Sequence, residues 1–174
     1  MTDKLLPLDL RMANSTERAE VVIDWVVANV KLANEDKAIQ ELLGRNFWEI
    51  IRQEWPGFDR INHEFYEQIF TKFRPYWNAS PAELALTDEV EIWRGQNRQN
   101  QQLGLSWATD RSIAERFARG LRFKNSEPVL YRTKTKSTDI ALAIDDRGEA
   151  EVVLFERPKH YEEVPITIDT RESQ

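Results

Sequence analysis

The sequence predicts an α+β protein with a helical lobe in its first half and a β-rich core with one intervening helix in its second half. Apolar residues recur with the 3.6-residue period of a helix up to about residue 75. After about residue 88 they alternate with the two-residue period of a strand. A chain of 174 residues can bury a sizeable core without disulfides or metals. We therefore divide it into a helical lobe, residues 1–88, and a core, residues 89–174.

Four helices are expected in the lobe. The first is centred on residues 19–30, where the apolar side chains fall on one face. A second helix over 35–43 is expected to stop at Gly44, because glycine commonly ends a helix. A third covers 46–54, and a fourth covers 59–73. The segment that follows, up to residue 88, reads as a connector with room for one helical turn.

The core is expected to contain six strands and one helix. The helix covers 111–119, with Asp110 as its N-cap. The strands are predicted at 91–94, 104–108, 129–133, 140–144, 152–155 and 164–168.

Composition excludes several classes of protein. There is no Cys, which rules out disulfides and thiolate chemistry, and the two His lie far apart at positions 63 and 160. No apolar run reaches the length of a membrane span, and the N-terminus lacks the apolar core of a signal peptide. We therefore expect a cytoplasmic protein with no membrane partner. The net charge of −6 also argues against a nucleic-acid partner.

The charge is unevenly distributed. Residues 1–88 carry 10 basic and 15 acidic side chains, whereas residues 111–136 carry eight basic and two acidic ones. This basic stretch is either an ordinary solvated face or a binding surface for an anionic group.

Two polar residues stand where predicted strands are expected to pack. Arg94 precedes Gly95 at a strand end, where a guanidinium can face phosphate or carboxylate, although an ordinary surface Arg fits as well. Ser106 lies in an apolar strand beside Trp107, so its hydroxyl needs a partner, which nearby backbone can also supply.

A third feature is a pair of carboxylates, Glu149 and Glu151, directly before a buried strand. At spacing two they point to the same side of a strand, where they repel each other unless a cation or ligand lies between them. At an edge facing water such a pair costs little. Because the run that follows is apolar, Glu151 is a candidate for a working carboxylate.

Taken in order, three segments carry a family resemblance: EIWRG at 91–95, GLSWATD at 104–110 with IAERFA behind it, and GEAEVVL at 148–154. They resemble the Arg…Ser…Glu-x-Glu class of mono-ADP-ribosyltransferases, in a compact form typical of bacterial toxins and phage effectors. The resemblance covers about residues 89–156. It implies an antiparallel β core packed around a cleft for NAD.

The same resemblance implies roles for individual residues. Glu151 is the expected catalytic carboxylate, Ser106 braces it, and Glu149 assists the acceptor. Arg94, with Gly95, is expected to hold NAD through its phosphate and ribose. Further residues expected at the NAD site are Trp107, Phe117 as the aromatic that stacks on nicotinamide, and Arg119 or Arg122 as phosphate contacts.

This sequence departs from the family pattern in two places. Ala108 stands where the family has a second Ser, and about a dozen residues separate Arg94 from Ser106, where many members insert helices. The resemblance therefore implies a minimal version of the fold.

The expected function is transfer of ADP-ribose from NAD, a co-substrate, to a side chain of a target protein, with Arg as the expected acceptor. Loss of nicotinamide leaves an oxocarbenium-like ribose that a carboxylate stabilises, and the neutral leaving group needs no histidine acid. Such a protein is expected to act as a phage or bacterial effector in the producing or infected cell. Two alternatives remain: an NAD glycohydrolase with the same residues, and a non-catalytic binding module that uses the basic stretch 111–136.

Overall fold

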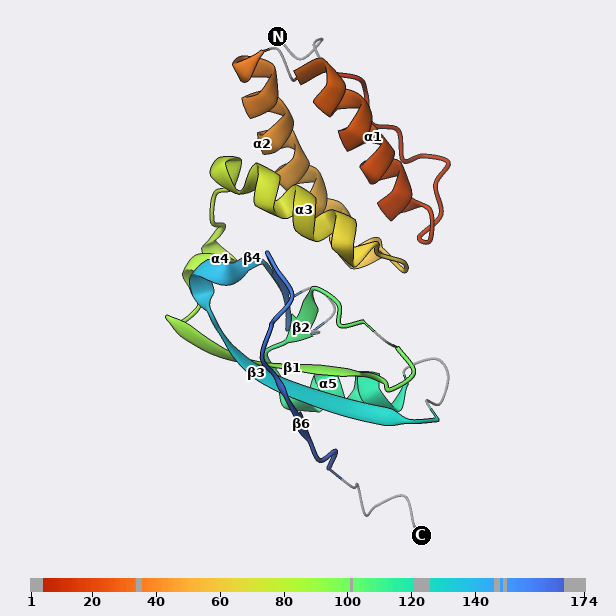
Figure 1. Ribbon diagram of the computed structural model, residues 1–174, viewed down its shortest axis with the longest axis vertical. Coiled ribbons are helices and arrows are strands. Elements are labelled where there is room, and N and C mark those ends of the chain that lie inside the picture. The colour runs from red at the N-terminus through yellow and green to blue at the C-terminus, as the bar shows by residue number, and fades with distance from the viewer. Residues whose placement is uncertain are drawn as a thin grey trace. The chain divides into compact units, whose positions relative to one another are not determined.

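The computed structural model describes residues 5–33, 36–100, 102–120, 126–145, 148 and 150–167. The chain forms two compact units, Met1–Asn78 and Ala79–Gln174. The first is helical and the second contains all six described strands. The α+β class predicted from the sequence is confirmed (Figure 1).

The helical unit is built from three helices with two short 3-10 turns after the second and third of them. Their bounds are α1 Arg18–Ala33, α2 Lys37–Glu54, η1 Trp55–Gly57, α3 His63–Phe73 and η2 Arg74–Tyr76. A cluster of aromatic side chains fills the core of this unit. Each of its members is at most 2% exposed: Phe47, Trp48, Trp55, Tyr66, Phe70 and Phe73.

Two polar atoms of this aromatic core are satisfied by backbone carbonyls. The Tyr66 hydroxyl donates to the Ala19 carbonyl at 2.8 Å, and the Trp48 indole donates to the Phe73 carbonyl at 2.8 Å. Buried hydroxyl and indole groups need such partners. These two bonds tie α3 to α1 and to α2.

The predicted stop at Gly44 is wrong: α2 runs through this position without a break. A Cβ at Gly44 would lie 2.2 Å from Cδ2 of Tyr76. The glycine is therefore required for packing against the Tyr76 ring, and not for ending a helix. A local pattern could not distinguish these two uses, because Tyr76 lies more than 30 residues further along the chain.

The second unit is a six-stranded antiparallel sheet in the order β4-β5-β2-β1-β3-β6. The strands are β1 Glu89–Asn97, β2 Ser106–Ala108, β3 Pro128–Lys136, β4 Ile140–Ile144, β5 Glu151–Leu154 and β6 Glu162–Val164. Each predicted strand overlaps a strand of the structure, although β1 and β3 are longer than predicted and β6 overlaps the predicted 164–168 only at Val164. The predicted helix, α5 Arg111–Arg119, packs against β1 and β3 (Figure 1).

The second unit begins ten residues before the predicted boundary at residue 89. A short helix, α4 Pro81–Leu84, lies at its start and is the helical turn expected in the connector. The buried carboxylate of Glu83 accepts a hydrogen bond from the Ala143 amide of β4 at 2.8 Å. This bond joins α4 to the sheet, which explains why the division falls after residue 78.

The sheet has a distinct apolar cluster on each face. One face carries Trp107 and Ile92 in a cluster with Val90, Ile140, Val152 and Leu154. The other face, covered by α5, carries Trp93 and Ala108 with Ala114 and Leu130. We call these the Trp107 face and the α5 face.

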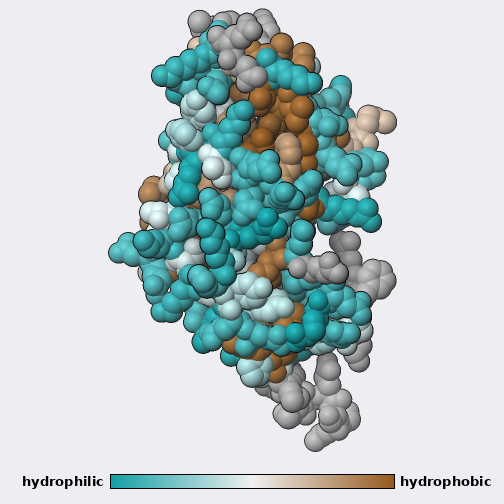
Figure 2. Space-filling view, in the orientation of Figure 1, coloured by the Kyte–Doolittle hydropathy of each residue, from teal (hydrophilic) through white to brown (hydrophobic). Residues whose placement is uncertain are grey.

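The face of the molecule shown in Figure 2 is mostly hydrophilic, with an apolar patch over the helical unit. Large apolar side chains exposed in the helical unit are Leu6, Met12, Val27 and Leu32. Within the described ranges no helix combines the length and the apolar character that crossing a bilayer requires.

Candidate functional site

The three principal candidate residues lie on three neighbouring strands. Arg94 belongs to β1, Ser106 begins β2 and Glu151 begins β5, and the sheet order places β2 between β1 and β5. All three side chains are half-buried. Residues that are 57 positions apart in the sequence are thus gathered in one part of the sheet.

The contact between β1 and β2 is narrow. Whereas β1 pairs with β3 over nine residues, its described pairing with β2 is confined to Trp93 opposite Ala108. β2 in turn pairs with β5, and Ala108 lies opposite Glu151. The candidate residues therefore lie where two halves of the sheet, β4-β5-β2 and β1-β3-β6, meet at a single residue pair.

The strand register shows which side chains share a face. Ser106 lies opposite Val153, so it is a diagonal neighbour of Glu151 on the α5 face. Arg94 follows Trp93, which is on the α5 face, so alternation makes Arg94 leave the strand on the Trp107 face. The structure thus brings Ser106 and Glu151 together on one face, and Arg94 approaches them from the other.

A hydrogen bond links the Arg94 side chain to β2. Its Nη1 donates to the backbone carbonyl of Ser106, and its Nε donates to Oε1 of Gln96 at 2.9 Å. Within the described residues Nη2 has no hydrogen-bond partner, and it is not among the buried polar atoms that lack one. The Nη2 edge is therefore the part of the guanidinium that the described protein atoms leave without a hydrogen bond.

Electrostatics link Arg94 to Glu151. Burial lowers the pKa of Arg94 to about 10, and the nearby negative charge of Glu151 opposes this shift. Arg94 therefore stays positively charged at neutral pH. The pair provides a cation and a carboxylate at the junction of β1, β2 and β5.

Gly95 has a packing role in the sheet. A Cβ at this position would lie 1.8 Å from the Ala114 carbonyl oxygen and 2.5 Å from the Ala118 amide nitrogen of α5. Only glycine lets the helix approach β1 this closely. The two neighbouring residues therefore differ in role. Gly95 allows α5 to pack closely against β1, whereas Arg94 projects from the other face of the strand.

Helix α5 begins as predicted and presents one of the expected aromatic residues. The Asp110 side chain accepts a hydrogen bond from the Ser112 amide at 2.7 Å, which confirms its role as N-cap. Phe117 is 39% exposed. Its ring is therefore accessible for the stacking role that the resemblance implies, a role that remains a prediction.

Arg119, an expected phosphate contact, is held by protein groups. It pairs with Glu115 at 3.5 Å and donates to the Thr167 carbonyl. Arg111 pairs with the same carboxylate at 2.9 Å and donates to the Pro165 carbonyl at 2.7 Å. These contacts fasten the segment after β6 to α5, which is a sufficient reason for both arginines.

The remaining predicted site residues are either buried or not described. Trp107 is 2% exposed in the cluster of its face, and its indole donates to the Gly104 carbonyl at 3.2 Å. This packing accounts for Trp107 without a ligand. Arg122 and Glu149 lie outside the described residues.

Sequence reasoning missed two buried polar residues of this unit. Gln96 is 6% exposed and contacts Arg94, although it lies beyond the strand predicted at 91–94. Glu115 is 6% exposed and was counted as one acidic residue in a basic stretch. The sequence shows that Gln96 stands two residues after Arg94, and that Glu115 stands four residues from both Arg111 and Arg119. Neither spacing reveals that the side chain is buried. Among the described residues no cluster of His, Asp and Glu could hold a metal ion.

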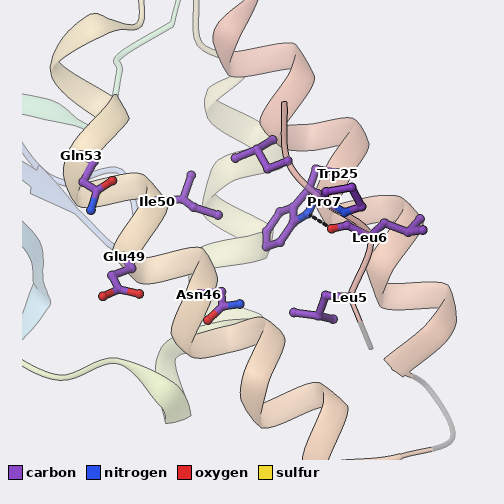
Figure 3. Close-up of a pocket in the computed structure, with 9 residues that line it drawn as sticks. Leu5, Leu6, Pro7, Trp25, Asn46, Glu49, Ile50 and Gln53 are labelled. Carbon is purple, nitrogen blue, oxygen red and sulfur yellow. Dashed lines mark hydrogen bonds between the residues drawn. The ribbon is translucent and has the colours of Figure 1, made fainter. Parts of the chain in front are cut away.

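The helical unit contains an open cavity of about 600 Å³ (Figure 3). One wall is the face of α2 that carries Asn46, Glu49, Ile50 and Gln53. The other wall consists of Trp25 and the extended segment Leu5–Leu8. None of the candidate residues named above lines this cavity.

Side chains of α1 hold that extended segment in place. The Trp25 indole donates to the Leu6 carbonyl at 2.7 Å, as the dashed line in Figure 3 marks. The Leu6 amide donates to Oδ1 of Asn29 at 2.7 Å, and Asn29 is fully buried. The wall is therefore a fixed part of the helical unit, since both polar groups of Leu6 are bonded.

Comparison with protein-family models, with curated proteins and with solved structures gave no match to this chain.

Proposed function

We propose that this protein is a mono-ADP-ribosyltransferase that uses NAD as its co-substrate. The observation that supports the proposal is that Arg94, Ser106 and Glu151 lie on three neighbouring strands next to the described residue pair that joins the two halves of the sheet, with Ser106 and Glu151 on one face and Arg94 bonded to the Ser106 carbonyl from the other. The order Arg, Ser, Glu along the chain is the order of the family motif that the sequence resembles.

The charges support a role for Arg94 with an anionic ligand. Its guanidinium is bonded to two neutral oxygens and keeps one edge open. NAD carries a pyrophosphate, and a planar guanidinium is suited to bind phosphate oxygens. In this proposal Arg94 binds the diphosphate part of NAD, and the exposed ring of Phe117 packs against nicotinamide.

Glu151 is the proposed catalytic residue. The bond between ribose C1′ and the nicotinamide nitrogen breaks, and its electron pair leaves with nicotinamide. A carboxylate beside the ribose stabilises the positive charge that develops there. The acceptor nitrogen then bonds to C1′ and releases a proton. Ser106, a diagonal neighbour of Glu151, would hold the carboxylate in position.

The proposal is tested with NAD labelled in its adenylate part, incubated with the protein and a bacterial lysate. We expect labelled protein bands and released nicotinamide from the wild type. Glu151→Gln should lower nicotinamide release about 100-fold or more, the loss typical of a group that stabilises transition-state charge. Glu156→Gln, at an exposed glutamate just after β5, serves as the matched control and should retain activity.

Each outcome separates the alternatives. Free ADP-ribose without labelled protein would indicate the NAD glycohydrolase. Absence of nicotinamide release from the folded wild type would rule out both enzymes. Unfolding of Glu151→Gln in a thermal scan would show that Glu151 is a structural residue, and the site assignment would be wrong.

A further inference from the structure

Gln96 is a buried polar residue that contacts the candidate site, and no motif points to it. It lies two residues after Arg94 on β1, so both side chains leave the strand on the same face. Gln96 is 6% exposed. Its Oε1 accepts the Nε proton of Arg94 at 2.9 Å, and its Nε2 donates to the Asn100 carbonyl at 3.2 Å.

These two bonds determine how the Gln96 amide is oriented. The Asn100 carbonyl can only accept, so the amide nitrogen must face it, and the amide oxygen must face Arg94. This oxygen accepts from Nε of the guanidinium, and the Ser106 carbonyl accepts from Nη1. The two bonds fix the orientation of the guanidinium plane. The remaining Nη2 edge is left for a ligand.

The partners of Arg94 are unusual for this unit because both are neutral. Four other described arginines of the unit form ion pairs with carboxylates: Arg98 with Glu163, Arg111 and Arg119 with Glu115, and Arg132 with Glu162. Within the described residues Arg94 forms no ion pair, and Glu151 acts on it only through its longer-range charge. Neutral acceptors satisfy N–H groups without cancelling the charge of the guanidinium.

We infer that Gln96 is a positioning residue that holds the Arg94 guanidinium between neutral acceptors, with its Nη2 edge and its full charge directed at the diphosphate of NAD. This inference rests on the proposed function for the identity of the anion. An amide at this position accepts from Arg94 and donates to the Asn100 carbonyl without adding a negative charge. A glutamate at this position would neutralise the cation that the ligand needs.

Two variants test this inference against one control. Gln96→Glu keeps the shape and adds a negative charge beside Arg94, and Gln96→Met keeps the length and removes the acceptor. Gln102→Glu adds the same charge at an exposed position and is the control. NAD binding is measured by calorimetry at low salt, and thermal midpoints report stability. The Hε–Nε NMR signal of Arg94 reports the bond to Gln96. This signal is assigned by its loss in Arg94→Lys.

The two Gln96 variants should behave differently. Gln96→Glu should bind NAD at least about tenfold more weakly than the wild type, because a carboxylate beside Arg94 cancels the charge that the ligand needs. Both variants lose the bond from Gln96 to the Asn100 carbonyl, so each should lose some thermal stability. Gln96→Met should lose the protected Hε signal, and KM for NAD should rise severalfold with a smaller change in kcat. A residue with a merely structural role would weaken NAD binding to the same extent in both variants.

The outcomes also separate this inference from the proposed function. Unchanged NAD affinity in both Gln96 variants, or an Arg94 Hε signal that exchanges freely in the wild type, would overturn the role of Gln96. If the wild type binds no NAD, the proposed function fails, and the Hε signal still decides whether Gln96 positions the guanidinium.

Discussion

Glu115 shows how a single buried charge can hold together distant parts of the core unit. Its carboxylate accepts hydrogen bonds from the Thr167 amide at 3.1 Å and the Thr167 hydroxyl at 2.8 Å, and it pairs with Arg111 and Arg119. Burial raises the pKa of Glu115, but the hydrogen bonds from Thr167 and the contacts with Arg111 outweigh it, so the pKa lies below its ordinary value of 4.5. The ionised form therefore stabilises the folded protein.

We predict a pH-dependent loss of stability in Glu115→Gln. Because the pKa is lower in the folded than in the unfolded state, the stabilisation is fully present above pH 4.5 and is lost as the pH falls through the folded-state pKa. At neutral pH the variant should lose about 1–3 kcal/mol of unfolding free energy, typical of losing hydrogen bonds to a buried charge.

The measurement is urea denaturation of Glu115→Gln and wild type at several pH values, with exposed Glu156→Gln as the control. The difference in unfolding free energy between Glu115→Gln and wild type should decrease as the pH falls below 4.5. If this difference in unfolding free energy stays constant across the pH range, the charge of Glu115 does not contribute to stability.

At the scale of elements, helix α2 depends on one close contact. Its middle residue Gly44 would normally weaken a helix by about 1 kcal/mol relative to alanine. The Tyr76 ring occupies the space that a Cβ would need. Intrinsic helix propensity and tertiary packing therefore act in opposite directions at this position.

A double-mutant cycle separates these two effects. Gly44→Ala alone should destabilise the protein, because the Tyr76 ring must move out of its place. In a Tyr76→Ala background the same change should be stabilising by up to about 1 kcal/mol, because only helix propensity remains. Thermal midpoints of the four proteins give the coupling, and additive effects would contradict the packing explanation.

Strand pairing is the other result that belongs to this scale. Periodicity located all six strands and α5 within a few residues, because burial of one face imposes a local pattern on the sequence. The order β4-β5-β2-β1-β3-β6 carries no such local signal, since β5 reaches β2 from 43 residues away. The neighbourhood of Arg94, Ser106 and Glu151 is a consequence of that order.

At the scale of the whole molecule, four basic residues in the described part of the stretch 111–136 are paired with carboxylates. In its described part, Arg111 and Arg119 pair with Glu115, Arg132 pairs with Glu91 and Glu162, and Lys134 pairs with Glu89. Most of these carboxylates come from other strands. The described part of this stretch therefore presents less positive charge than the sequence count suggests.

This pairing predicts weak binding to polyanions. At about 0.15 M salt we expect no detectable complex with duplex DNA in a filter-binding assay, because four of the described cations already pair with carboxylates and the net charge of the chain is −6. Tight binding with a steep salt dependence, retained in Glu151→Gln, would instead favour the non-catalytic binding module.

Local patterns in the sequence determined the α+β class, the two-part organisation, the N-cap at Asp110 and the residues Arg94, Ser106 and Glu151 as candidates. They could do so because helix and strand periods and capping depend on near neighbours. Only the tertiary structure decided that Gly44 and Gly95 make room for Tyr76 and α5, that Trp107 is core, and that Gln96 contacts Arg94. Those facts depend on side chains that strand pairing and packing bring together, and such contacts leave no periodic trace along the chain.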